Sequence, residues 1–152
     1  MLIKVRVYSQ KMILLLVLTA IFFSCKRDPE WITELEELIL KTTRRLEDVS
    51  PFFAESAQPA ELFIGLARLE KIIDDSTDEA RLLWQKHPEI RTQADYIDNR
   101  LRNRFQNLGG NMRKISTSIR NWDQKLKQKD FHDIVVRLWT KTQKAKSITI
   151  FD

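Results

Sequence analysis

Apolar side chains recur at alternating steps of three and four residues along most of this chain, and that spacing decides its fold class. Residues three and four apart share one face of an α-helix, so each run predicts a helix with one side against a core. The longest run steps through Leu62, Leu66, Leu69, Ile73, Ser76, Ala80, Leu83 and His87. It predicts a single helix of about 28 residues, roughly 40 Å long.

Prolines mark where the predicted helices start. Pro29 follows Asp28, a favoured N-cap residue, and Pro59 and Pro88 stand at the head of two later runs. The residue before a proline disfavours helical backbone, so the first helix is expected to end at Ser50. Three helices are therefore expected to begin at or beside these prolines.

Gly109 and Gly110 are adjacent, and with Gly65 they are all the glycines in the chain. Two neighbouring glycines cost about 2 kcal/mol inside a helix, which favours a turn at this point. The apolar stripe nevertheless keeps its phase from Phe105 to Leu126, as it would along one continuous helix. A turn is the expected structure, and a long kinked helix is the alternative.

After Leu126 the stripe slips, and Asp130 is expected to cap a final helix with Phe131, Ile134, Val135, Leu138 and Trp139 on its apolar side. Phe52 and Phe53, in the first connection, are expected to pack over the end of the bundle. The complete pattern predicts an all-α protein, an antiparallel bundle of four or five helices over residues 30–146. Residues 147–152 follow as a short tail.

The chain begins with a different kind of segment. Residues 12–23 are apolar apart from Thr19, three basic residues precede them, and the first acid is Asp28. An apolar run of about 12 residues is short for a membrane span, which needs about 20. A basic start, an apolar run and then the small Ser24 predict a signal peptide over residues 1–24. The alternatives are an uncleaved membrane anchor and a buried core helix.

Cys25 is the only cysteine, and it comes directly after Ser24. The pair resembles the lipobox of bacterial lipoproteins, with Phe22 and Phe23 where that family usually has a branched aliphatic and then a small residue. The resemblance implies cleavage between Ser24 and Cys25 and attachment of lipid, such as palmitate, to the cysteine. Residues 25–29 would then form a lipidated tether.

A lipidated Cys25 implies an exported protein held in the bacterial cell envelope by acyl chains. The bundle would face the periplasm or the cell surface. Lys26 stands where aspartate retains some lipoproteins at the inner membrane, which favours the outer membrane. The expected function is a binding or structural role with a protein partner in the envelope, and nucleic acid is not an expected partner.

Charge is spread unevenly along the chain. Residues 26–99 carry 10 basic and 17 acidic side chains, whereas residues 100–152 carry 13 basic and 4 acidic ones. One interpretation is that acidic early helices pack beside basic late helices. The other is a basic surface for an anionic partner, made by Arg100, Arg104, Arg113, Lys114 and Arg120.

Motifs of catalysis and metal binding are absent from the sequence. The two histidines, His87 and His132, belong to no metalloprotease, haem-attachment or zinc motif, and no glycine-rich phosphate loop occurs. The chain is therefore predicted not to be an enzyme and to need no metal or cofactor. An acidic patch of Asp74, Asp75, Asp78 and Glu79 is expected to be solvated or to pair with basic helices rather than to hold a cation.

Two other functions fit the sequence less directly. A carrier of a small hydrophobic ligand or lipid would have a cavity walled by Phe52, Phe53, Trp31, Trp84, Trp122 and Trp139. An envelope enzyme would show converging polar side chains in a cleft. Core packing is the simpler explanation of the aromatic residues.

Overall fold

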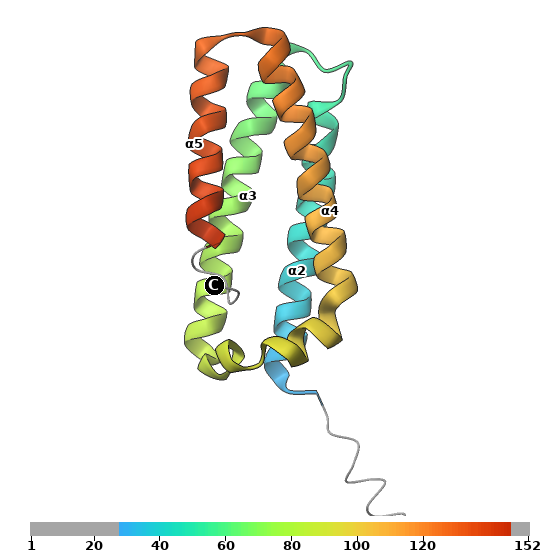
Figure 1. The fold of residues 1–152 in the computed structure, drawn as a ribbon, viewed down its shortest axis with the longest axis vertical. Helices are drawn as coiled ribbons and strands as arrows, with labels where there is room; N and C mark the ends of the chain where they lie inside the picture. The colour runs from blue at the N-terminus through green and yellow to red at the C-terminus, as the bar shows by residue number, and fades with distance from the viewer. Residues whose placement is uncertain (1–27, 147–152) are drawn as a thin grey trace, which may run out of the picture.

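The computed structural model describes residues 28–146, which form four α-helices (Figure 1). These are α2 (Glu30–Val49), α3 (Pro59–Lys86), α4 (Ala94–Leu126) and α5 (Lys129–Lys146), with the short 3-10 helices η1 (Ser50–Phe53) and η2 (Pro88–Thr92) between them. Successive α-helices run antiparallel, so the predicted all-α bundle is confirmed with four α-helices in this range. The expected signal peptide, Cys25 and the tail 147–152 lie outside the described residues.

The second helix follows its prediction closely. α3 begins at Pro59 and is 28 residues long. At its start the side chains of Gln58 and Glu61 form a capping box, in which the Gln58 backbone N–H donates to Glu61 Oε2 at 2.7 Å. This reciprocal pair satisfies donors that the first turn of a helix leaves unpaired.

Two predicted helix caps were wrong. α2 begins at Glu30 with Pro29 in the cap position, and the extended backbone of Pro29 leaves Asp28 outside the helix start. α5 begins at Lys129, which places Asp130 inside the first turn, where an acid still complements the helix dipole.

The predicted third helix start was also wrong, since Pro88 opens the short η2. α4 begins only at Ala94. The 3-10 helix places Ile90 at the end of the bundle, where its side chain is fully buried. Burial of that side chain explains why the chain makes a separate turn before the long helix starts.

The turn predicted at Gly109-Gly110 does not exist, because α4 passes through both glycines without interruption. Leu108 and Met112 on either side pack against the core, and Ile115 beyond them is buried. Burying side chains of this size contributes more than the about 2 kcal/mol that two glycines cost. The phase of the stripe was therefore a better guide than the glycine pair.

The apolar interior consists of two clusters. The upper cluster, toward the α4–α5 turn, takes residues from all four helices and includes Leu46, Leu66, Ile119 and Phe131. The lower cluster, toward the start of α2, comprises Trp31, Ile32, Leu35, Ile39, Leu83, Trp84, Ile90, Ile97 and Leu101, with no residue of α5. α5 ends part of the way along α3, so it covers only the upper part of the bundle (Figure 1).

Gly65 allows η1 to approach α3 closely. A Cβ added at Gly65 would stand 2.7 Å from the Phe52 Cβ and 3.0 Å from the ring of Phe53. Phe53 is 2 % exposed, and its carbonyl and that of Ala54 accept from the Trp122 indole N–H at 3.3 and 3.2 Å. The expected packing of the two phenylalanines at the end of the bundle is confirmed.

Candidate functional site

The basic surface predicted on α4 divides into two parts. In the lower half, Arg100 donates to Asp28 at 2.6 and 3.1 Å, and Arg104 donates to Glu36 at 3.0 Å. These two side chains are therefore neutralised by acids at the start of the chain and on α2. They tie α4 to the rest of the bundle and do not share one free surface with the remaining three.

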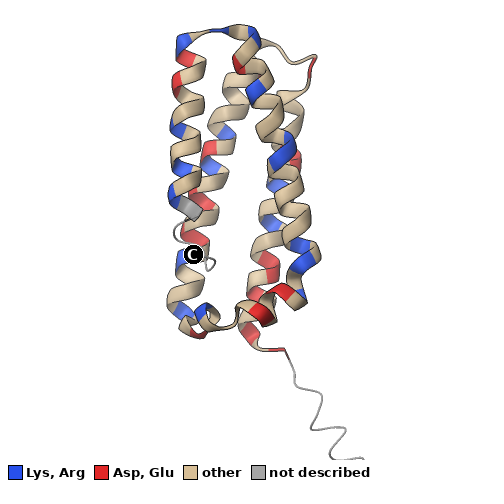
Figure 2. Cartoon of the chain, viewed as in Figure 1, with Lys and Arg blue, Asp and Glu red and all other residues tan. Residues whose placement is uncertain are grey.

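The upper members are placed differently. Arg113, Lys114 and Arg120 are exposed, and no acid among the described residues pairs with any of them. Arg113 and Arg120 are seven residues apart, so they project from one side of α4 about 10 Å from each other. Lys127 and Lys129 extend this charge across the α4–α5 turn (Figure 2). We call these five residues the distal basic end.

The acidic patch is largely occupied by ion pairs. Glu79 accepts from Lys41 at 2.7 Å, and Asp74 accepts from Lys141 at 2.8 Å. Glu70, one turn before Asp74, binds both Lys141 and Arg137. The interpretation that acidic early helices pack beside basic late ones is thus supported at α3–α5, as it is at α2–α4. Within residues 28–146 no group of three or more potential metal ligands gathers.

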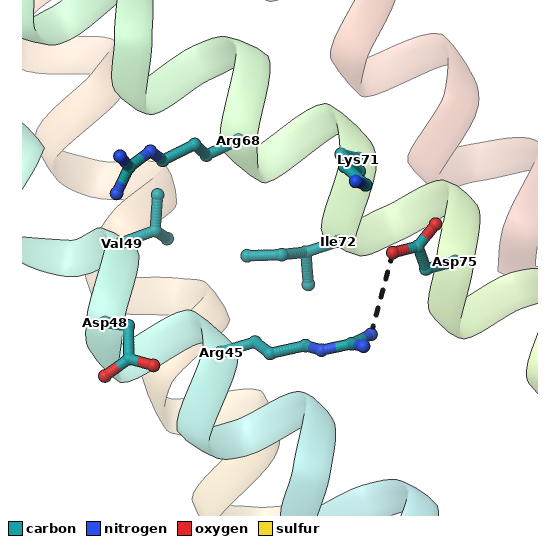
Figure 3. A pocket seen from close by; sticks show the side chains of 7 residues that line it. All are labelled: Arg45, Asp48, Val49, Arg68, Lys71, Ile72 and Asp75. Atoms are coloured by element: carbon teal, nitrogen blue, oxygen red, sulfur yellow. Dashed lines mark ion pairs between the residues drawn. The ribbon is translucent and has the colours of Figure 1, made fainter.

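A hollow lies on the seam between α2 and α3, with a volume of about 300 Å³ (Figure 3). Val49 and Ile72 lie between its charged side chains, which are Arg45, Asp48, Arg68, Lys71 and Asp75. Arg45 reaches Asp75 at 3.8 Å, and Arg68 lies 4.7 Å from the centre of the Phe52 ring. The hollow is open to solvent.

The aromatic residues proposed to wall a carrier cavity lie mostly in the core. Trp31 and Trp84 are buried in the lower cluster, while Trp122 and Trp139 pack against the upper one. Phe53 forms one edge of a second open hollow of about 400 Å³ beside Lys114. None of these six residues lines the hollow on the α2–α3 seam.

Both histidines face acids that sequence reasoning did not assign to them. His132 Nδ1 lies 2.9 Å from Asp123 Oδ2 across the α4–α5 turn. His87 lies between Glu34 and Glu89, with nitrogen-to-oxygen distances of 3.5 and 3.4 Å that are too long for strong hydrogen bonds. The apolar stripe loses its phase after Leu126, which indicates a turn between two helices there. That turn is the sequence signal for the contact between His132 and Asp123.

No family model, curated protein or solved structure matches this chain. Among residues 28–146, no helix is both long enough and apolar enough to cross a membrane. The geometry of the chain itself is therefore the basis for a functional proposal.

Proposed function

We propose that this chain is a lipid-anchored protein of the bacterial cell envelope that binds a partner through its distal basic end. The proposal is carried by the opposite placement of the anchor point and the unpaired cations. Asp28 and the start of α2 lie at one end of the bundle, and the α4–α5 turn lies at the other (Figure 1). Cys25 precedes Asp28 by three residues in the sequence, so the proposal assigns the anchor to that first end.

This arrangement sets the distance between the membrane and the binding surface. α3 has 28 residues and spans the bundle, which at 1.5 Å per residue is roughly 40 Å. A bundle held upright by lipid on Cys25 would carry Arg113, Arg120 and Lys127 well beyond the Debye length of about 8 Å from the anchoring surface. The distal basic end would then meet a partner out in the envelope and not the headgroups beneath it.

The kind of partner follows from the charges. Five exposed cations, of which Arg113, Lys114 and Arg120 pair with no described acid, attract an acidic surface and orient it during encounter. A protein with an acidic patch fits this requirement, and a structural role in holding such a protein near the membrane is consistent with it. Acyl chains contribute about 0.8 kcal/mol for each buried methylene, so stable anchoring takes more than one chain.

Native mass spectrometry of the full-length protein, extracted gently from the membranes of its own cells, tests the proposal. The expected species begins at lipidated Cys25 and carries a bound partner. Cys25→Ser is the matched control, because it removes the acylated thiol and leaves the bundle unchanged. A parent chain that starts at Met1 would overturn the lipoprotein assignment.

A further inference from the structure

In each of the three long helices the buried side chains are interrupted at the same level along the bundle. In α2 none lies between Ile39 and Leu46, in α3 none lies between Leu69 and Leu83, and in α4 none lies between Leu101 and Ile115. These gaps face one another, because Lys41 pairs with Glu79, Arg104 with Glu36, and Asn111 with Glu47. A weakly buried layer therefore lies between the upper and lower clusters, and Leu108 within it packs against both.

Hydroxyl groups occupy the layer on α2 and α3. Thr42 and Ser76 meet with their oxygens 3.0 Å apart, and Thr42 also donates to the Leu38 carbonyl at 2.9 Å. Thr43 and Thr77 each donate to the carbonyl four residues earlier in their own helix. Back-bonding of this kind slightly weakens and bends a helix, so the layer joins the two clusters less firmly than apolar packing would.

On α4 the same layer holds Gly109 and Gly110. Nothing in the closed bundle requires glycine at either position, because neither residue has a positive φ and a Cβ added to either meets no atom within 4 Å. Glycine nevertheless raises the flexibility of the backbone and lowers helix stability. The closed bundle alone therefore gives no reason for a glycine pair at this level of α4.

We propose that α4 is hinged at Gly109-Gly110, and that its lower half, residues 94–108, opens from α2 together with η2 while the upper four-helix half stays packed. Ile97 and Leu101 hold the lower half by burial, and exposed ion pairs to Asp28 and Glu36 add little. No residue of α5 joins the lower cluster, so the lower half of α4 and η2, with the buried Ile90, are all that has to move. The inference does not depend on the lipid anchor.

Opening uncovers the lower cluster at the end of the bundle that follows Cys25. Trp84 is 6 % exposed, and its indole N–H is buried without an acceptor among the described residues. A buried donor without an acceptor pays a desolvation penalty that hydration in the open state relieves. The freed segment has about 15 residues, a length at which an isolated helix is marginal in water, so its backbone hydrogen bonds are lost on opening.

Hydrogen exchange of the full chain in detergent micelles tests the hinge. Amides of residues 98–108 are expected to exchange at least about tenfold faster than those of residues 115–122, since the lower half opens by itself. The double variant Gly109→Ala, Gly110→Ala folds without clashes and is expected to slow exchange of residues 98–108 by on the order of 10- to 30-fold.

Asn121→Ala with Gln124→Ala is the matched control, because both positions are exposed on the upper half of α4 and alanine raises helix propensity there too. This control is expected to leave exchange of residues 98–108 within about twofold of the parent value. Equal exchange rates for the two halves of the parent protein would overturn the hinge. So would a control that slows residues 98–108 as much as the glycine variant does, because the halves would then open together.

Discussion

Asp28 and Arg100 are 72 positions apart in the chain and form an ion pair with a nitrogen-to-oxygen distance of 2.6 Å. The Tyr96 hydroxyl donates to the same carboxylate at 2.7 Å. Asp28, the first described residue, is thereby joined to α4 at the end of the bundle where α2 begins. The hydrogen bond from Tyr96, followed by that from Arg100, lowers the pKa of Asp28 below its ordinary value of 3.8.

A lowered pKa makes this contact sensitive to acid. A carboxyl whose pKa is depressed on folding stabilises the fold above its ordinary pKa, and that contribution is lost as the pH falls through the depressed value. We expect the lower half of α4 to exchange amide protons faster as the pH falls below 3.8, and Asp28→Asn to remove much of that acid dependence. The measurement is hydrogen exchange of residues 96–104, corrected for intrinsic rates, between about pH 3 and pH 6.

Asp98→Asn is the control for this prediction. Asp98 also has a lowered pKa, through its hydrogen bond from Arg102, but both residues belong to α4. Its protonation breaks no contact between helices. If Asp98→Asn flattens the pH profile as much as Asp28→Asn, the acid response belongs to α4 itself and not to the contact that holds it.

The same substitution is expected to have opposite effects at two glycines. Gly65→Ala forces the new methyl against Phe52 and Phe53, and overpacking of this kind destabilises by about 1–3 kcal/mol. Gly109→Ala adds a methyl in open space within a helix and is expected to stabilise by roughly 0.5–1 kcal/mol. Urea unfolding curves of the two variants measure both changes. Equal signs would contradict the close approach of η1 to α3.

Much of the fold could be predicted because buried side chains recur every three to four residues along a helix, and this spacing is visible in the sequence. The spacing of Leu62, Leu66 and Leu69 gave the length and the buried face of α3, since a helix repeats its faces every three to four residues. Gly109 and Gly110 misled the prediction, because local helix propensity is a weak term beside packing between helices. The η2 turn was missed because its cause, burial of Ile90 under the bundle, lies in the tertiary structure.

The candidate site was less predictable for a related reason. The sequence placed Arg100 and Arg113 on one candidate surface. In the structure Arg100 is neutralised by an ion pair with Asp28, whereas Arg113 pairs with no described acid. Which cations find acids depends on which helix ends meet, and sequence spacing within α4 carries no such information. The signal peptide expected over residues 1–24 rests on local composition alone and stays a prediction, because those residues lie outside the described part of the chain.

Phe131 is expected to be a principal residue of the upper cluster. It is fully buried at the start of α5, and its ring meets that of Phe63 edge to face at a distance of 5.7 Å between ring centres. Phe131→Ala is expected to cost about 3–5 kcal/mol in the free energy of unfolding. Val136→Ala on the same helix truncates a side chain that is 49 % exposed. It should change the free energy of unfolding by less than about 0.5 kcal/mol. Comparable losses of unfolding free energy in the two variants would mean that α5 does not pack on the upper cluster through Phe131.

The distal basic end is expected to control partner binding by its charge. Arg113→Glu with Arg120→Glu reverses two cations that lie on one side of α4, and the partner recovered with the full-length protein should fall by at least about tenfold. Arg91→Glu with Arg102→Glu makes the same change in net charge near the other end of the bundle and should leave recovery unchanged. Raising the salt concentration should weaken the parent complex, because exposed charges are screened over about 8 Å at physiological ionic strength. Equal losses from both variants would show that net charge, and not this surface, governs binding.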